Sequence, residues 1–238
     1  MKNIIEFDTL PSTNLYLKEN YHQLADRTVV VANHQTAGRG RLSRRWEDSD
    51  DLLFSILLKD NLPHNLANIS LLVAASLYKT LNEILDNVTI KWPNDILVRG
   101  KKLAGILLES VVIGEKVDCI IIGVGINVNT AKLSEELKQK ATSIYLQINR
   151  KINKKELLEK FLKEFRRDYQ FYSENKSDYL QICRDHSYVI GKEVIVTINN
   201  QPKKALVLDI LENGNILLLI NEKKVELNSG EITLQELY

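Results

Sequence analysis

Hydrophobic residues recur with helical spacing in two long stretches of the chain. One stretch places eight apolar side chains on one face of about five helical turns: Leu66, Ile69, Leu72, Val73, Leu77, Leu81, Ile84 and Leu85. The other opens with Asn153 and Glu156, spaced as in a capping box, and its inner face holds Leu157, Leu158, Phe161, Leu162, Phe165 and Tyr169. The lysines and arginines between these apolar residues are expected to face solvent. A shorter helix is predicted after Ser12 or Thr13, either of which can cap it.

Short apolar runs between these helices predict strands. They lie at Val29–Ala32, Leu52–Leu58, Val88–Trp92, Ile96–Val98, Lys102–Glu109 and Val117–Ile122. Strands and helices are therefore interspersed over residues 1–185. We expect an α/β (α+β) domain there, with a mixed central sheet flanked by helices.

The pattern changes near residue 186, where apolar and polar residues alternate with period two. Alternating segments lie at Val194–Ile198, Ala205–Val207, Ile216–Ile220, Val225–Leu227 and Ile232–Leu234. Turn signals at Asn199–Asn200 and at residues 212–215 separate several of them. We expect residues 186–238 to form a second, all-β domain, a small barrel.

Composition narrows the class of protein. The 238 residues include 44% hydrophobic residues, enough for a sizeable core, and 32 basic against 31 acidic residues leave a net charge of +1. This balance argues against a nucleic-acid coat or a membrane-surface protein, although it permits a local basic site. Cys119 and Cys183 form no metal-binding or disulfide pattern. The acidic N-terminus and the absence of a long apolar run predict a soluble, cytoplasmic protein.

Residues 35–46 form the first stretch that suggests chemistry. Four arginines and two glycines follow directly on a predicted buried strand. Glycine allows a backbone to approach a ligand closely, and arginine offers a planar fork of donors suited to phosphate. Four acids follow at Glu47, Asp48, Asp50 and Asp51, and we expect them to pair with this loop when no ligand is bound. An exposed charged hairpin is the alternative interpretation of the same residues.

The second stretch combines Lys91–Asp95 with Lys102–Glu109. A Trp-Pro-Asn-Asp turn ends one strand, and Lys102 stands at the mouth of the next, an apolar strand interrupted by Gly105. A missing Cβ opens space beside a sheet or marks a bulge. Lys102 is therefore placed either to hold an anionic group over an apolar pocket or simply to extend into solvent.

The third stretch is Ile121–Asn129, in which Gly123 and Gly125 are expected to follow a strand. No third glycine and no helix come after them, so a dinucleotide-binding Rossmann motif is excluded. The remaining interpretation is that the two glycines allow the backbone to approach a ligand closely, and that the Asn127 side chain offers hydrogen bonds beside them.

Taken in order, these motifs resemble those of the biotin protein ligases (biotin–acetyl-CoA-carboxylase ligases). The matching residues are Ser12-Thr13-Asn14, Gln35-x-x-Gly38-Arg39-Gly40-Arg41, Lys91-Trp92-Pro93-Asn94-Asp95, Lys102-Leu103-Ala104-Gly105-Ile106 and Gly123-x-Gly125-Ile126-Asn127. The resemblance covers about residues 8–130 by motif. It extends to the C-terminus by architecture, because the family carries a small SH3-like barrel there.

The resemblance implies a two-step reaction with biotin, ATP and Mg²⁺. Biotin and Mg-ATP give biotinyl-5′-AMP and pyrophosphate, and the biotinyl group then passes to one lysine of a biotin carboxyl carrier protein. By likeness, the biotin-binding residues are Ser12, Thr13, Asn14, Gln35, Arg39, Gly40, Arg41, Lys102, Gly105 and Gly123. The ATP-binding residues by likeness are Gly38, Trp46, Lys91, Asn94, Asp95 and Asn127. Protein ligands for the metal are not identified, and Mg²⁺ is expected to be held mainly through the phosphates of ATP.

Electrostatics agrees with the roles implied for Lys102, Arg39 and Arg41 as catalytic residues. A carboxylate must attack the α-phosphorus of a polyanion, and two like charges at about 4 Å repel by roughly 1 kcal/mol in water and roughly 4 at an effective dielectric of 20. Nearby cations remove this repulsion and stabilise the charge that grows on phosphorus. No dedicated base for the second step is evident, and proximity is expected to supply much of its rate.

The chain departs from the family in the basic loop. The family usually has glycine where Ser43 stands and a Ser-Pro-x-Gly stretch after the tryptophan, which residues 47–51 replace here in a loop about two residues shorter. Some family members carry an N-terminal helix-turn-helix that binds DNA. Since the first motif begins at Ser12, we expect no such segment, no DNA binding and no repressor function.

Two other functions use the same residues. A lipoate or octanoate ligase would share the catalytic fold and Lys102, but Gly-Arg-Gly-Arg together with Lys-Trp-Pro-Asn-Asp favours biotin. A non-enzymatic RNA-binding module could use the Arg39–Arg45 loop and the barrel, which the net charge of +1 disfavours. No membrane partner is expected, and the sequence leaves a homodimer open.

Overall fold

The computed structural model describes residues 3–41, 44–47, 49–60, 62, 66–174, 176–198, 201–228 and 232–234. Ser43, Asp48 and the predicted turn at Asn199–Asn200 lie outside the described residues.

A seven-stranded sheet forms the larger part of the molecule, in the order β1-β2-β3-β7-β6-β5-β4. Its strands are β1 (Ile4–Leu10), β2 (Val29–Gln35), β3 (Leu52–Leu58), β4 (Val88–Lys91), β5 (Asp95–Val98), β6 (Lys101–Ile113) and β7 (Lys116–Ile126). β1 and β2 run parallel and the other neighbours antiparallel, so the predicted mixed sheet is confirmed. β1 was not predicted, because this edge strand buries only part of its side chains and carries no continuous apolar run.

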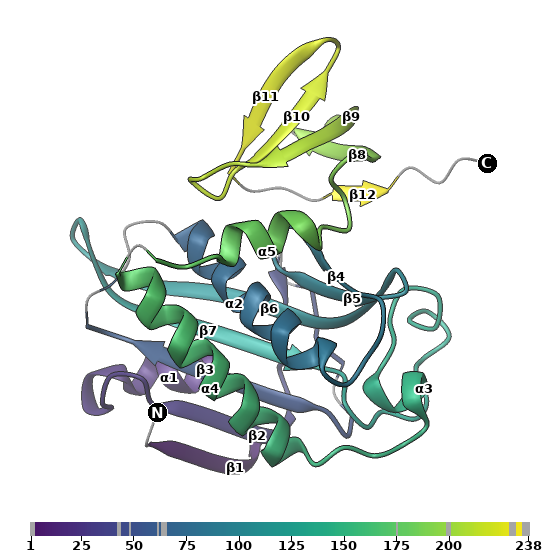
Figure 1. Cartoon of the computed structure of the whole chain (residues 1–238). Coiled ribbons are helices and arrows are strands. Elements are labelled where there is room, and N and C mark those ends of the chain that lie inside the picture. The colour runs from purple at the N-terminus through teal and green to yellow at the C-terminus, as the bar shows by residue number, and fades with distance from the viewer. Residues whose placement is uncertain are drawn as a thin grey trace.

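Helices cover both faces of this sheet (Figure 1). One face carries α1 (Thr13–Asn20), which is followed by the 3₁₀ turn η1 (Tyr21–Gln23), and the other carries α2 (Leu66–Asn82), α4 (Lys154–Ser173) and α5 (Tyr179–Asp185). β3 is buried on both faces: Leu57 packs with Leu17 of α1, whereas Phe54 packs with Phe161 of α4. A fully apolar strand sequence is therefore expected at this position.

The three predicted helices are confirmed, together with their caps. The Ser12 hydroxyl accepts a hydrogen bond from Leu15 N at 3.5 Å, and Asn153 Oδ1 accepts from Lys155 N and Glu156 N. α3 (Ile144–Ile148) and α5 were not predicted, since helices of five and seven residues are too short to establish a periodic pattern. In the part of the chain that the structure describes, no helix is both long and apolar enough to cross a membrane.

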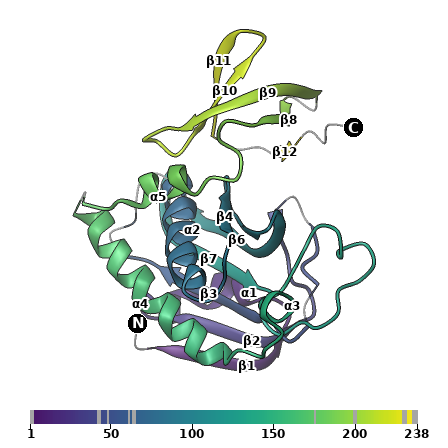
Figure 2. The ribbon, with the colours of Figure 1, turned by 45° about the vertical axis from the view of Figure 1, so that its right-hand side comes forward.

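The C-terminal strands form a separate antiparallel sheet in the order β11-β10-β9-β8-β12. They are β8 (Glu193–Ile198), β9 (Gln201–Ile210), β10 (Ile216–Ile220), β11 (Lys223–Leu227) and β12 (Ile232–Leu234). Alternate side chains such as Val194, Val196 and Leu218 are buried, so the predicted all-β part is confirmed. The domain boundary expected at residue 186 stays a prediction. In Figures 1 and 2 this sheet lies beyond α5 and the start of α2.

Both cysteines are buried. Burial raises the pKa of the Cys119 thiol, and it raises the pKa of Cys183 to about 12. Both thiols therefore stay protonated and unreactive at neutral pH.

Candidate active site

Three glycines form a bare track on the face of the sheet that carries α1. Gly105 of β6 pairs in register with Gly125 of β7, and Gly123 lies two residues before Gly125 in the same strand. An added Cβ would lie 2.3 Å from Asn14 Oδ1 at Gly123, 2.7 Å from the Trp46 ring at Gly125, and 3.0 Å from Lys102 Nζ at Gly105. The missing side chains thus allow an amide, an indole and an ammonium group to lie close against the strands. The expectation that Gly123 and Gly125 follow a strand is wrong, because β7 continues to Ile126.

A buried polar network occupies the Asn14 end of this track. Thr13 donates to Gln35 Oε1 from its backbone nitrogen at 2.7 Å and from its hydroxyl at 3.2 Å. Ser55 Oγ lies 2.6 Å from both Thr13 Oγ1 and Asn14 Oδ1, and Asn14 Nδ2 donates to Glu109 Oε2 at 2.7 Å. The structure therefore brings Thr13, Asn14 and Gln35 together, as predicted, from the start of α1 and the end of β2.

Sequence reasoning missed two members of this network. Ser55 is fully buried in the apolar strand β3, and Glu109 lies in β6. Each is a polar residue within an otherwise apolar run, where an unpaired polar group is costly. That contrast is the signal that could have identified them.

The opposite end of the track is cationic. Lys102 Nζ forms an ion pair with Asp95 Oδ1 at 2.8 Å and lies 5.6 Å from the centre of the Trp46 ring. Arg41 donates from a terminal guanidinium nitrogen to Asn94 Oδ1 at 2.9 Å. The Asn94 amide is itself fixed, because Nδ2 donates to Ile106 O at 3.0 Å. Asn94 and Asp95, at the start of β5, thus hold two cations on one side of the sheet.

The basic loop is a hairpin that ends at Trp46. Trp46 N donates to Gly38 O at 3.0 Å, Gly40 N donates to Arg44 O at 2.7 Å, and a β-bridge joins Arg39 to Arg45. Gly38 is buried, whereas the Arg39 side chain is exposed. Trp46 Nε1 is buried without a hydrogen-bond partner among the described residues. The hairpin interpretation and the ligand-loop interpretation are therefore compatible, since the exposed Arg39 is joined to a base that is anchored at Gly38 and Trp46.

Two of the acids after Trp46, Asp50 and Asp51, do not pair as predicted. Asp50 pairs with Lys154 at 2.9 Å and with Lys151 at 3.3 Å, and Asp51 is buried and accepts from Thr130 Oγ1 at 2.6 Å and from Val128 N at 2.9 Å. The expectation that these two acids pair with the arginine loop is wrong. They instead connect the start of β3 to the lysines near the start of α4 and to the segment after β7.

Two further predicted residues border the cationic end. Lys91 is half-buried and faces Asp95 across the β4–β5 pair. Asn127 is buried, and its Nδ2 donates to Thr142 O at 2.9 Å. The segment that contains Thr142 also holds the backbone of Lys102. Lys102 N donates to Lys140 O, and Lys102 O accepts from Thr142 N, both at 2.9 Å.

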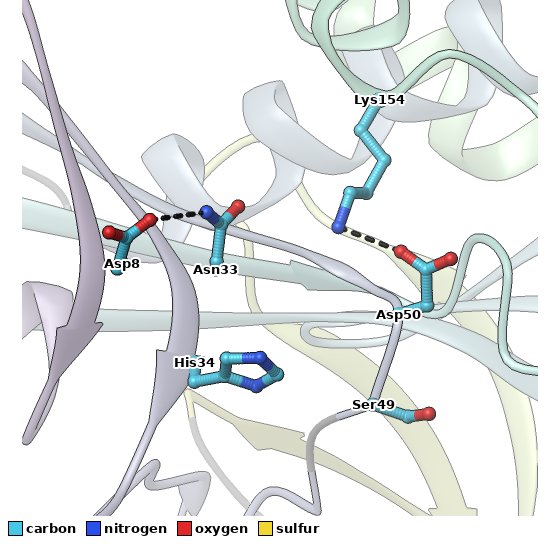
Figure 3. Close-up of a pocket in the computed structure, with 6 residues that line it drawn as sticks. All are labelled: Asp8, Asn33, His34, Ser49, Asp50 and Lys154. Atoms are coloured by element: carbon cyan, nitrogen blue, oxygen red, sulfur yellow. Dashed lines mark hydrogen bonds and ion pairs between the residues drawn. The ribbon is translucent and has the colours of Figure 1, made fainter.

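A separate polar pocket of about 520 Å³ lies beside the first turn of α4 (Figure 3). It is lined by Asp8, Asn33, His34, Ser49, Asp50 and Lys154. Figure 3 shows Lys154 paired with Asp50 and Asn33 donating to Asp8, at 2.9 and 3.1 Å. None of the predicted site residues lines this pocket, and its charged groups largely satisfy one another.

Comparison with known proteins identifies the family. Residues 5–127 match the biotin/lipoate A/B protein ligase family, and residues 189–234 match the biotin protein ligase C-terminal domain. The chain belongs to this family. The match of residues 189–234 and the relatives described below place the chain among the biotin protein ligases of this family.

The relatives and solved structures agree. The bifunctional ligase/repressor BirA of Bacillus subtilis is 32% identical over 245 residues, which cover 98% of this chain and 74% of that protein. The biotin–[acetyl-CoA-carboxylase] ligase of Mycobacterium tuberculosis is 29% identical and covers 87% of this chain and 79% of its own length. The structure of the Aquifex aeolicus biotin protein ligase with biotin and ATP superposes with a TM-score of 0.87, at 33% identity over 99% of both chains.

Biotin ligation is therefore the general activity of this family member, with biotin and ATP as substrates. The resemblance inferred from the sequence motifs is confirmed. The relatives named here are biotin ligases, which favours biotin over lipoate and leaves the RNA-binding alternative without support.

Proposed function

We propose that the chain activates biotin with Mg-ATP to biotinyl-5′-AMP and transfers the biotinyl group to a lysine of a biotin carboxyl carrier protein. The observation that carries this proposal is the polarity of the glycine track. A hydrogen-bonding network of hydroxyl and amide groups with one carboxylate, Glu109, lies at the Asn14 end, and two cations lie at the other end, beyond Gly125. Biotin has the same polarity, with a neutral ureido ring at one end and a carboxylate at the other.

The fused ring of biotin would bind at Ser12 and at the network that contains Thr13, Asn14 and Gln35. A ureido group has two N–H donors and one carbonyl acceptor, and hydroxyl and amide side chains can match both kinds of group. Gly105 and Gly123 would line the slot. Asn14 and Trp46 lie over glycines two residues apart in β7, a spacing of about 7 Å along a strand, so the two ends of the ligand would contact different side chains along the same strand.

Lys102, Arg39 and Arg41 would act on the reacting groups. Lys102 would hold the carboxylate and the α-phosphate, and the arginines would neutralise phosphate charge as the carboxylate oxygen attacks phosphorus and pyrophosphate leaves. Arg39 and Gly40 lie toward the tip of the hairpin, and Arg41 already reaches Asn94. Closure of this hairpin over the adenylate would exclude water from the mixed anhydride.

The nucleotide would lie on the Trp46 side of the cationic end, among Gly38, Lys91, Asn94, Asp95 and Asn127. Trp46 offers a flat apolar ring for the adenine. The Asn127 nitrogen is committed to Thr142 O, which leaves the Asn127 side-chain oxygen as an acceptor suited to the amino group of adenine.

Mg²⁺ would enter with ATP and be held mainly by its phosphates, whose charge it partly neutralises. The described residues contain no cluster of three or more His, Cys, Asp or Glu side chains that could hold a metal ion. Asp95 offers one carboxylate beside the place proposed for the phosphates.

Transfer to the carrier would follow at the same site. The carrier lysine would attack the carbonyl carbon of biotinyl-AMP, an amide bond would form, and AMP would leave with the oxygen of the former anhydride. We assign no dedicated base, and effective concentration accounts for much of the expected rate.

Biotin-dependent exchange of pyrophosphate into ATP tests the first step. Wild-type protein should catalyse exchange with biotin and not with lipoate. Lys102→Ala should reduce exchange by about 100-fold or more, as expected for removal of a group that stabilises transition-state charge.

Lys101→Ala is the matched control, because the adjacent Lys101 ammonium donates to Lys138 O on the surface. This control should retain exchange. Exchange with lipoate alone, or full activity in Lys102→Ala, would contradict the proposal.

A further inference from the structure

Three side chains from the first part of the chain converge on the turn between β9 and β10. The Trp92 indole N–H donates to Gly214 O at 3.0 Å, and Asn68 Nδ2 of α2 donates to Glu212 O at 3.3 Å. Arg184 of α5 donates to Ile210 O at 2.7 Å and to the Glu212 carboxylate at 2.8 Å. Residues 209–214, which we call the docking turn, therefore connect the small sheet to the larger part of the molecule (Figures 1 and 2).

The docking turn fits against α2 without spare room. Gly214 has a φ of +80°, and an added Cβ would lie 2.5 Å from Asn68 Oδ1 and 3.2 Å from Ala67 Cβ. A side chain at this position would force the turn away from α2. The position of Gly214 O, and of the indole group bonded to it, is therefore closely defined.

Trp92 connects this contact to the cationic end of the site. Its side chain is 1% exposed, and the residues that follow it are Pro93, Asn94 and Asp95. Ser70, also near the start of α2, donates to Pro93 O at 2.8 Å. Residues 92–95 are thus held from one side by α2 and the docking turn, while Asn94 and Asp95 bind Arg41 and Lys102 on the other side.

We infer that Trp92 is a positioning residue for adenylate formation. Through the Trp92–Gly214 hydrogen bond, the C-terminal sheet holds residues 93–95 where Asn94 and Asp95 direct Arg41 and Lys102 toward the reacting groups. The inference rests on the proposed function. Thr13 and Ser55, at the ring end of the proposed biotin site, belong to α1 and β3 and lie outside this connection.

Trp92→Phe tests the inference, because it keeps an aromatic ring and removes the N–H donor. We expect the kcat of biotin-dependent pyrophosphate exchange to fall by about tenfold or more, since small misplacements of catalytic groups are costly. Biotin affinity, measured by calorimetry without ATP, should stay within about twofold of the wild-type value. Gly214→Ala should lower kcat in the same way while leaving the indole intact, and the double variant should be no worse than the poorer single variant.

Arg184→Gln is the matched control. It weakens the same interface at Ile210 and Glu212 without touching residues 92–95. This variant should lose stability yet keep kcat. An unchanged kcat in Trp92→Phe, or an equal kcat loss in Arg184→Gln, would overturn the inference, because only general docking of the sheet would then matter.

Hydrogen exchange supplies a readout that does not depend on activity. Ile106 N donates to Asn94 O at 2.9 Å, so its amide reports the position of residue 94. Trp92→Phe should speed exchange at Ile106 and leave Thr13 N, which donates to Gln35, unchanged. If these hydrogen-exchange changes occur but the wild-type protein does not catalyse pyrophosphate exchange, the proposed function is refuted and the structural connection is not. If hydrogen exchange at Ile106 is unchanged in Trp92→Phe, the connection is refuted whatever the activity of the protein.

Discussion

Ser55 illustrates how much a single hydroxyl can contribute at the residue scale. It lies 2.6 Å from both Thr13 Oγ1 and Asn14 Oδ1, and no other residue in the described network contacts both. These two side chains belong to the same turn of α1, while Ser55 belongs to β3. The hydroxyl therefore fixes the start of the helix against the sheet at the proposed ring end of the biotin site.

We predict that Ser55→Ala weakens biotin binding by about tenfold, because a buried polar group left without its partner costs about 1–3 kcal/mol. Isothermal calorimetry with biotin alone measures this change. Ser76→Ala is the control: it removes another fully buried hydroxyl, bonded to Asp168 at 2.8 Å between α2 and α4, and should lower stability without changing biotin affinity. Equal biotin affinities for Ser55→Ala and wild type would refute the role of Ser55.

At the scale of elements, the segment before β3 connects several elements through two neighbouring acids with opposite titration behaviour. A hydrogen bond from Lys154 holds the pKa of Asp50 below its ordinary value of 3.8. Desolvation raises the pKa of Asp51 above that value, against the hydrogen bond from Thr130. The two acids therefore contribute to the free energy of unfolding with opposite dependence on pH.

The direction of each acid's effect on the free energy of unfolding depends on whether the folded state prefers its charged or its protonated form. Asp50 stabilises the fold above pH 3.8, and this contribution is lost as pH falls through its lowered pKa. Asp51 behaves in the reverse sense, because its contribution is present below pH 3.8 and is lost as pH rises through its raised pKa. Asp50 is 42% exposed, so solvent screening keeps its contribution small, under about 1 kcal/mol.

Urea unfolding between pH 3 and pH 7 measures both effects. Asp50→Asn should be less stable than wild type at neutral pH, and the difference should vanish in acid. Asp51→Asn keeps an acceptor for Thr130, and its stability relative to wild type should increase as the pH rises from about 4. Parallel pH curves for the two variants would contradict this assignment.

At the scale of the whole molecule, the proposed site draws on α1, β2, β3, β5, β6 and β7, and the C-terminal sheet supports it through the docking turn. A ligand that bridges both ends of the glycine track engages more of these elements than biotin alone. Binding to the folded state raises the free energy of unfolding according to ligand concentration relative to Kd.

We therefore predict a stepwise increase in stability. Biotin at about 100 times its Kd should add about 2.7 kcal/mol to the free energy of unfolding. Biotin with Mg-ATP should add more in the wild type, because adenylate fills both ends, and this further increase should disappear in Lys102→Ala. Thermal denaturation monitored by calorimetry checks both steps; an equal ATP increment in the two proteins would show that Lys102 does not contact the reacting groups.

Local pattern determined most elements of this protein. α2 and α4 bury their apolar faces in one core, and period-two alternation identified the C-terminal strands. These elements were predictable because each buries a face whose spacing matches its own geometry. The motif residues were likewise visible in the sequence, since charge, glycine and amide groups clustered in short segments whose composition is costly for purely structural roles.

Only the tertiary structure decided which of these groups meet. The partners of Asn14 lie 41 and 95 residues away, and Trp92 reaches Gly214 across 122 residues of chain. Periodicity describes neighbours along one element, whereas strand order and domain docking decide contacts between distant segments. The same distinction explains why the acids of residues 50 and 51 were paired wrongly: sequence proximity suggested the arginine loop, and the packing of α4 and β7 supplied nearer partners.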